Sequence, residues 1–112
     1  DDAPQRLQRL KLYSLEVSGM TDAGAARLYL LPDLMWLGLA GSNLTDAGLA
    51  HVVQLQKLIM LDLWDNKRIT DAGLELLTRL PKLRDLKVPG TSVTEAGLAR
   101  FRAARPDVKI VH

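Results

Sequence analysis

The residues of this chain best suited to chemistry are four acidic side chains that recur at nearly constant spacing. Each is the second residue of a Thr-Asp-Ala-Gly segment, or of its Thr-Glu-Ala-Gly variant. The segments begin at Thr21, Thr45, Thr70 and Thr94, which gives spacings of 24, 25 and 24 residues. Carboxylate oxygens gathered at one place are ligands for a divalent cation. We therefore ask first whether the backbone would gather them in that way.

A structural interpretation of the segment accounts for all four of its residues. Threonine suits a helix N-cap, where its hydroxyl accepts a hydrogen bond from an otherwise unpaired N–H group. An acidic residue in the first helical turn is favoured by the helix dipole, and Ala and Gly allow close packing against a neighbour. Stacked coils would separate the carboxylates by roughly 5 Å at strands and 8–10 Å at helices. This separation suits a ladder of caps rather than a metal site, and we predict no metal.

Other catalytic groups are scarce. The two histidines are His51, within a predicted helix, and His112, the last residue. Neither stands at a motif spacing from a nucleophile, and the sequence has no glycine-rich phosphate loop. The absence of cysteine excludes disulfides, thiolate metal sites and a cysteine nucleophile. We predict no catalytic site, no cofactor and no enzymatic activity.

The elements that position the acidic residues follow from two apolar periods. A Leu-x-x-Leu-x-Leu pattern precedes three of the segments, and its alternating part is typical of a short strand with one buried face. After each segment, apolar residues recur every three positions, as on one face of a short helix. One such strand–helix unit cannot bury its own apolar face, so units must stack. The strand sets are Leu34, Leu37, Leu39; Leu58, Leu61, Leu63; and Leu83, Leu86, Val88, and the helix sets are Ala25, Leu28, Leu31; Leu49, Val52, Leu55; Leu74, Leu77, Leu80; and Leu98, Phe101, Ala104.

We expect one domain over residues 1–112, with a partial unit at 1–10 and a terminal strand at 108–111. The four full units cover about 11–33, 34–57, 58–82 and 83–107. Pro32, Pro81 and Pro106 end the helices and force extended backbone. The predicted strands lie near 11–17, 35–40, 59–64, 84–88 and 108–111 in one parallel sheet, and the helices begin just after the four threonines.

The register of the first strand has two solutions. Constant spacing back from Thr21 gives Leu10, Tyr13 and Leu15 as the buried set. Matching Leu15-Glu16-Val17-Ser18-Gly19 to Leu86-Lys87-Val88-Pro89-Gly90 gives Leu12, Leu15 and Val17 instead. The sequence leaves both open.

The repeats resemble leucine-rich repeats over about residues 7–111. The resemblance implies an α/β, right-handed solenoid, a horseshoe segment with a parallel sheet on its concave face and short helices on its convex face. The segment Leu44 to Leu49, Leu-Thr-Asp-Ala-Gly-Leu, is similar to the cysteine-containing, ribonuclease-inhibitor-like class, which includes substrate-binding arms of F-box proteins. It is also similar to Thr-Asp-Ala-Gly-Leu arrays of planctomycete-type bacteria. The chain departs from that class in lacking its cysteine, near which Asn43, Lys67 or Arg68, and Ser92 fall.

The residues between buried leucines point into the concave face of such a solenoid. Both tryptophans of the chain stand there, and tryptophan is enriched among interface hot spots. We therefore predict a module that binds a protein partner through this face. The alternative is that the tryptophans cover the ends of the solenoid or pack against segments outside this chain. The predicted partner-binding residues are Trp36, Met60, Asp62, Trp64, Asp85 and Lys87.

Two further functions compete with this one. Residues 83–112 carry 6 Lys+Arg against 3 Asp+Glu, while residues 1–82 carry 9 against 10. Nucleic acid could contact the basic end, but its one aromatic residue, Phe101, belongs to the predicted apolar helix set, so no aromatic residue is expected to be exposed among the basic ones. The chain also starts at Asp1 in mid-unit, which suggests a piece of a longer array or self-association through the N-terminal edge. The basic residues in question are Arg79, Arg84, Arg100, Arg102, Arg105 and Lys109.

Composition narrows the remaining classes. The hydrophobic fraction of 47% and charged fraction of 25% are those of an ordinary folded domain. No stretch reaches the roughly 18 apolar residues of a membrane span, so we expect no membrane partner. The compartment stays open.

Overall fold

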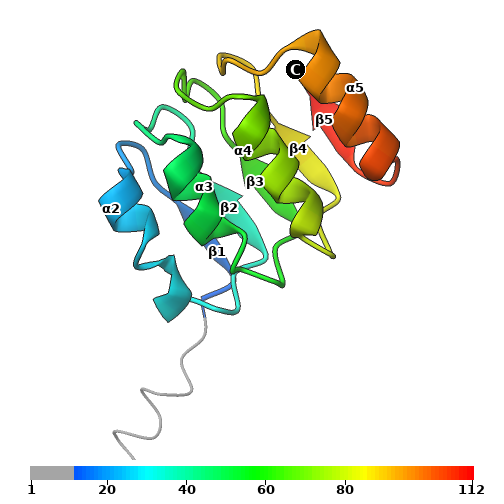
Figure 1. The fold of residues 1–112 in the computed structure, drawn as a ribbon. Coiled ribbons are helices and arrows are strands. Elements are labelled where there is room, and N and C mark those ends of the chain that lie inside the picture. The colour runs from blue at the N-terminus through cyan, green and yellow to red at the C-terminus, as the bar shows by residue number, and fades with distance from the viewer. Residues whose placement is uncertain (1–11) are drawn as a thin grey trace, which may run out of the picture.

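A computed structural model describes residues 12–112 of the chain, in which strands alternate with short helices (Figure 1). The strands are three residues long, and each α-helix begins at the acidic residue of a Thr-Asp-Ala-Gly or Thr-Glu-Ala-Gly segment. The elements are β1 (Ser14–Glu16), α2 (Asp22–Ala25), the 3₁₀ helix η1 (Leu28–Leu30), β2 (Trp36–Gly38), α3 (Asp46–Val52), β3 (Met60–Asp62), α4 (Asp71–Leu76), the 3₁₀ helix η2 (Leu77–Arg79), β4 (Asp85–Lys87), α5 (Glu95–Ala104) and β5 (Lys109–Val111).

The strands form one parallel sheet in the order β1-β2-β3-β4-β5, so that chain order and spatial order agree. Leu15, Leu37, Leu61, Leu86 and Ile110 stand opposite one another across it. The helices cover one side of the sheet only (Figure 1). Each coil is thus a strand, a loop and a helical segment that returns the chain to the next strand. The predicted parallel solenoid is confirmed, although the strands are shorter than their predicted ranges.

Each helix begins where the sequence predicted, because its threonine acts as N-cap. The four cap residues have extended backbone, and each hydroxyl accepts a hydrogen bond from an N–H of the first turn at 3.2–3.3 Å. The caps are Thr21, Thr45, Thr70 and Thr94. None of the described helices is both long and apolar enough to cross a membrane.

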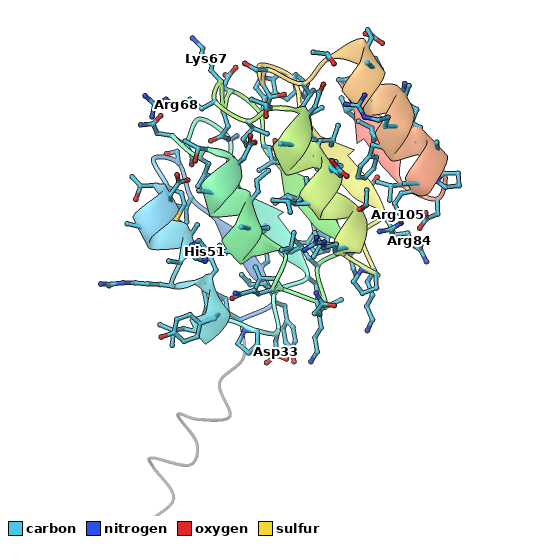
Figure 2. The ribbon with its side chains drawn as sticks, viewed as in Figure 1. Asp33, His51, Lys67, Arg68, Arg84 and Arg105 are labelled. Carbon is cyan, nitrogen blue, oxygen red and sulfur yellow. The ribbon has the colours of Figure 1, made fainter. Side chains whose placement is uncertain are left out.

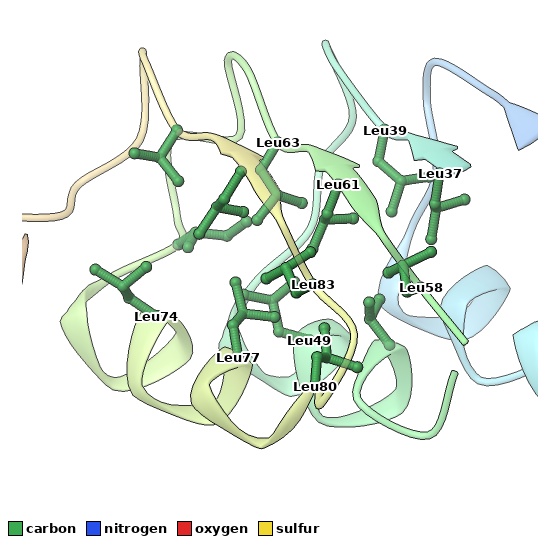
Figure 3. Packing of buried hydrophobic residues seen from close by; sticks show 14 of the residues in the cluster. Leu37, Leu39, Leu49, Leu58, Leu61, Leu63, Leu74, Leu77, Leu80 and Leu83 are labelled. Atoms are coloured by element: carbon green, nitrogen blue, oxygen red, sulfur yellow. The ribbon is translucent and has the colours of Figure 1, made fainter. Parts of the chain in front are cut away.

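The core is a layer of leucine between the sheet and the helices (Figure 3). Strand residues such as Leu37 and Leu61 meet helix residues such as Leu49 and Leu77, and all four have no solvent exposure. Neighbouring coils share this layer, so a leucine of one coil packs against the coils on either side. The predicted strand sets from the second, third and fourth units are all buried.

The apolar period of three in the helices reflects a tight helical turn. In the first and third units the α-helix gives way to a 3₁₀ helix, in which residues i and i+3 lie on the same line. Leu77 and Leu80 therefore both stay in the core. The last helix, α5, remains α-helical to Ala104, which turns that side chain away. The expectation that Ala104 is buried was wrong, and Leu31 is only partly buried.

The register of the first strand is the second of the two solutions. Leu15 pairs with Leu37, and Leu15 and Val17 pack against the core. Tyr13 is 52% exposed, which excludes the first solution. Leu12 holds the position of Leu34 but is 41% exposed. The predicted partial unit at 1–10 and its leucines, Leu7 and Leu10, lie outside the described residues.

A pair of leucine truncations tests the division between core and surface. Leu61→Ala should lower the free energy of unfolding by roughly 2–5 kcal/mol, because it leaves a cavity at a fully buried site. Leu30→Ala is the matched control, since Leu30 is 63% exposed, and it should cost less than about 0.5 kcal/mol. Urea unfolding measures both, and equal losses would show that the inward register is wrong.

Candidate functional site

The acidic residues of the repeated segments link each coil to the next. The Thr45 amide donates to Oδ1 of Asp22 at 2.9 Å, and its hydroxyl donates to Oδ2 at 2.5 Å. Asp46 accepts the same pair of bonds from Thr70, and Asp71 accepts it from Thr94. We call these three contacts the acidic ladder. Each carboxylate accepts hydrogen bonds from two donors of the following coil. The sequence pattern assigns these residues only to the dipole of their own helix, so it did not predict this link.

The glycines of the last three segments make room for the ladder. A Cβ added at Gly73 would collide with Oδ1 of Asp46 and lie 2.9 Å from Cδ1 of Leu49. Gly48 and Gly97 face Asp22 and Asp71 in the same way. Gly24, in the first of the four segments, instead faces Sδ of Met20 at 2.7 Å. In the last three segments the glycine is therefore required by the preceding carboxylate, which confirms the close packing predicted for it. The alanine of each segment is exposed, so the same expectation for alanine was wrong.

Two ladder carboxylates have lowered pKa values. Burial raises the pKa of Asp22, but hydrogen bonds from the Thr45 hydroxyl and amide and from Gly48 outweigh it, so the net shift is downward. The pKa of Asp71 is lowered by hydrogen bonds from the Thr94 hydroxyl and amide, with a further contribution from Arg100. Both groups are therefore held as carboxylates by the coil that follows them.

The ladder carboxylates bind donors of the following coil within the chain. Each of these carboxylates already accepts two hydrogen bonds, one on each oxygen, and the three carboxylates are spread over successive coils. Among residues 12–112, no cluster of three or more His, Asp or Glu side chains is arranged to hold a metal ion. His51 lies on α3 (Figure 2). His112 is exposed at the end of the chain.

A second polar link between coils was missed in the sequence. Asn66 is fully buried, its amide group donates to the Leu39 carbonyl at 2.8 Å, and its Oδ1 accepts from the Leu44 amide at 3.1 Å. Ser42 bridges to the coil before it by accepting from the Met20 amide at 2.9 Å. Both occupy the N/C position of Leu-x-x-Leu-x-Leu-x-x-N/C. Asn43 and Lys67, which we had placed near that position, follow it by one residue and are exposed.

Two rows of side chains cross the open face of the sheet, on the side away from the helices. One row places Trp36 beside Met60 and Asp85, between Ser14 and Lys109 at the two ends. The other runs from Glu16 through Gly38, Asp62 and Lys87 to Val111. We call these residues the strand face. Five of the six predicted partner-binding residues lie side by side in it.

The strand face is hollowed on both sides of Trp36 and Met60. A hollow of about 280 Å³ is lined by these two residues with Glu16, Gly38 and Asp62. A second hollow, of about 270 Å³, is lined by the same two with Asp85, Lys87 and Lys109. Gly38 contributes no side chain to the first hollow. A Cβ added at Gly38 would lie 3.1 Å from Cγ of Glu16, so the Glu16 side chain packs over this glycine. Trp36 is 51% exposed between the two hollows.

Trp64 is the predicted residue that the structure sets apart. It follows β3, is 45% exposed, and lines neither hollow. Its amide donates to Oδ1 of Asp62 at 3.0 Å, so part of that carboxylate is used locally. Glu16 and Lys109 were missed as face residues. The open register of the first strand hid Glu16, and the terminal strand carried no motif that would have pointed to Lys109.

Half of the basic residues considered at the C-terminal end have partners within the fold, among them Arg84 and Arg105 (Figure 2). Arg105 donates to the carbonyl groups of Thr78, Leu80 and Leu83, which closes the end of the preceding coil. Arg84 pairs with Asp107 at 2.8 Å, and Arg100 lies 3.7 Å from Asp71. Three of the six residues considered for nucleic acid therefore have partners in the chain.

Comparison with known proteins supports the repeat architecture. No family model and no curated protein matches the sequence. Among solved structures, a leucine-rich-repeat protein of Leptospira interrogans matches 92% of the chain with a TM-score of 0.55 and 20% identity. An internalin of Listeria monocytogenes matches 89% with a TM-score of 0.57 and 18% identity. The chain spans 30% and 34% of their lengths. The fold is thus an α/β leucine-rich-repeat solenoid, with the sheet on its concave face and the helices on its convex face.

A glycine comparison tests the ladder. Gly73→Ala should lower the free energy of unfolding by about 1–3 kcal/mol, because the methyl group collides with Asp46 and Leu49. Gly24→Ala is the matched control at the same helix position, where the contact is the end of the flexible Met20 side chain. Gly24→Ala should be close to neutral, because the cost of displacing Met20 is offset by the preference of helices for alanine over glycine, about 0.5–1 kcal/mol. Equal effects in urea unfolding would contradict the packing role of the ladder.

Acid should weaken the ladder. A carboxyl group whose pKa is lowered on folding stabilises the fold above its unfolded pKa of about 3.9, and this contribution is lost as the pH falls through the folded pKa. Stability should therefore decrease below about pH 4, and Asp71→Asn should reduce that decrease. Asp85→Asn, on the strand face away from the ladder, is the control. The free energy of unfolding of both variants would be measured in urea above and below about pH 4. If the two variants lost the same stability in acid, the contribution assigned to the Asp71 carboxylate would be wrong.

Proposed function

We propose that this leucine-rich-repeat chain is a non-catalytic interaction module that binds a protein partner through its strand face. The observation that carries the proposal is the half-exposed Trp36 between two hollows, with Met60 beside it. Large apolar side chains pointing away from a core lower solubility, and contiguous exposed apolar surface commonly marks an interaction site. The predicted residues Asp62, Asp85 and Lys87 supply polar groups around this centre, and Trp64 would contribute from its edge.

Self-association through the first coil is the second candidate. Four large apolar side chains are exposed there, namely Leu12, Tyr13, Tyr29 and Leu30. Leu12 and Tyr13 lie next to β1, which has one described neighbour in the sheet, and Tyr29 and Leu30 lie in η1 of the same coil. A second copy of the chain, or a further repeat of a longer array, would bury them. Light scattering distinguishes this candidate, because it requires a species larger than a monomer.

Nucleic-acid binding through the basic end is less well supported, since Arg84, Arg100 and Arg105 have partners in the fold.

The class of leucine-rich repeat to which the chain is related is also a proposal. The chain resembles the cysteine-containing class and planctomycete-type arrays in its Thr-Asp-Ala-Gly-Leu segments, and we propose this relationship on those residues alone.

Substitution of Trp36 tests the proposed function. Affinity capture by Trp36→Ala should lose the proteins captured by the parent chain, because truncation of a buried tryptophan hot spot typically costs about 2 kcal/mol or more, roughly thirtyfold in affinity. Trp64→Ala should weaken capture as well. Tyr29→Ala, an aromatic truncation in the first coil at a residue 61% exposed, is the control: it should capture normally through the strand face, and its loss of capture would support the first coil as the site instead.

Melting temperatures separate binding from folding. All three variants should melt close to the parent chain, since none of these rings belongs to the buried core. If Trp36→Ala destabilised the fold while capture by the folded fraction was unchanged, the tryptophan would be structural and the proposal would fail.

A further inference from the structure

The size of the strand face restricts what can bind it. Three residues of strand extend for about 10 Å, and five strands cover about 19 Å across the sheet at the usual spacing. The face is therefore roughly 200 Å², whereas each side of a standard complex between folded proteins buries about 800 Å². An extended segment of about six residues crossing the strands would cover the face completely.

The hollows fit side chains better than a separate small molecule. Each measures about 270–280 Å³, which is below the range of about 300–1,000 Å³ typical of ligand pockets. The two hollows share the apolar wall formed by Trp36 and Met60. Two side chains of one peptide can enter the two hollows, with an apolar residue between them packed against Trp36.

Charge divides the face into two halves. The hollow toward β1 is lined by two carboxylates, those of Glu16 and Asp62, and by one ammonium group, that of Lys87. The hollow toward β5 contains Lys87 and Lys109 with Asp85. Among residues 12–112, none of the four ion pairs includes any of these five side chains. The first half therefore attracts a cation and the second attracts an anion.

We infer that the strand face binds an extended, charge-polarised peptide segment, an inference that rests on the proposed function. A basic side chain lies over Glu16 and Asp62, an apolar side chain packs on Trp36 and Met60, and an acidic side chain lies over Lys87 and Lys109. The two charged hollows are separated by about 2.5 strand spacings, or roughly 12 Å. The basic and acidic residues of the peptide are therefore about three or four positions apart, because an extended chain advances about 3.3 Å per residue.

Selection from a displayed library of random peptides, about eight residues long to exceed the span of the face, tests the inference. The immobilised parent chain is the target and Trp36→Ala is the counter-target. Peptides enriched on the parent should carry a basic and an acidic residue about three or four positions apart around an apolar residue. Synthetic versions with both charges basic, or both acidic, should bind more weakly.

Charge removal on the protein completes the test. Both Glu16 and Lys109 are exposed, so the double variant Glu16→Gln with Lys109→Gln should fold normally. It should bind the selected peptide about two- to thirtyfold more weakly, as expected for two surface charge pairs. Glu75→Gln with Arg102→Gln, an equal change on the helix side at exposed positions, is the matched control and should leave affinity unchanged.

The outcomes separate the two proposals. Peptides that depend on Trp36 but show no charge pattern, and bind the Glu16/Lys109 variant normally, would overturn the polarity and leave the proposed function standing. Enrichment of no peptide on the parent over Trp36→Ala would overturn the peptide inference. The proposed function would then be decided by the capture experiment, which also detects folded partners.

Discussion

A carboxylate of one coil that binds the threonine of the next is the contact on which this fold depends. No single strand–helix unit can bury its apolar face, so stability arises between coils. Leucine packing supplies most of that stabilisation, but it is not directional. The bonds from Thr45 to Asp22, and their two repeats along the chain, add direction, because both oxygens of each carboxylate must meet an amide and a hydroxyl. Glycine at the next coil is the condition that lets this contact form.

The strand face is a consequence of that stacking. Since the coils repeat at a fixed register, residues that are separated by about 24 positions in the sequence become neighbours in a row. Trp36 and Met60 are brought together in this way, as are Asp62 and Lys87. The ladder and Asn66 keep the coils aligned from the loop side, while Arg105 fastens the last helix to the coil before it. The face itself can then vary freely, because its side chains contribute little to the core.

Much of this arrangement could be predicted from the sequence, because it depends on the repeat spacing and on the positions of the apolar residues within each repeat. The threonine caps, the parallel strands and the buried leucines follow from spacing alone. The ladder did not, since a contact between Asp46 and Thr70 depends on how two helices pack, and their local patterns describe only each helix. The exposure of Ala104 depended on whether a helix tightens to 3₁₀ at its end. Glu16 and Lys109 joined the candidate site only once the end strands had a register.

The central claim is that successive coils are coupled through carboxylate and threonine, and a double-mutant cycle at Asp46 and Thr70 tests it most directly. Unfolding free energies would be measured for Asp46→Ala, Thr70→Ala and the variant carrying both. The two residues contact each other through two hydrogen bonds in the middle of the solenoid, so the cycle should give a favourable coupling energy of at least about 0.5 kcal/mol. Single losses that add to within about 0.3 kcal/mol would show that the two residues act independently. The coils would then be held together by leucine packing alone, and the account given for the repeated motif would be wrong.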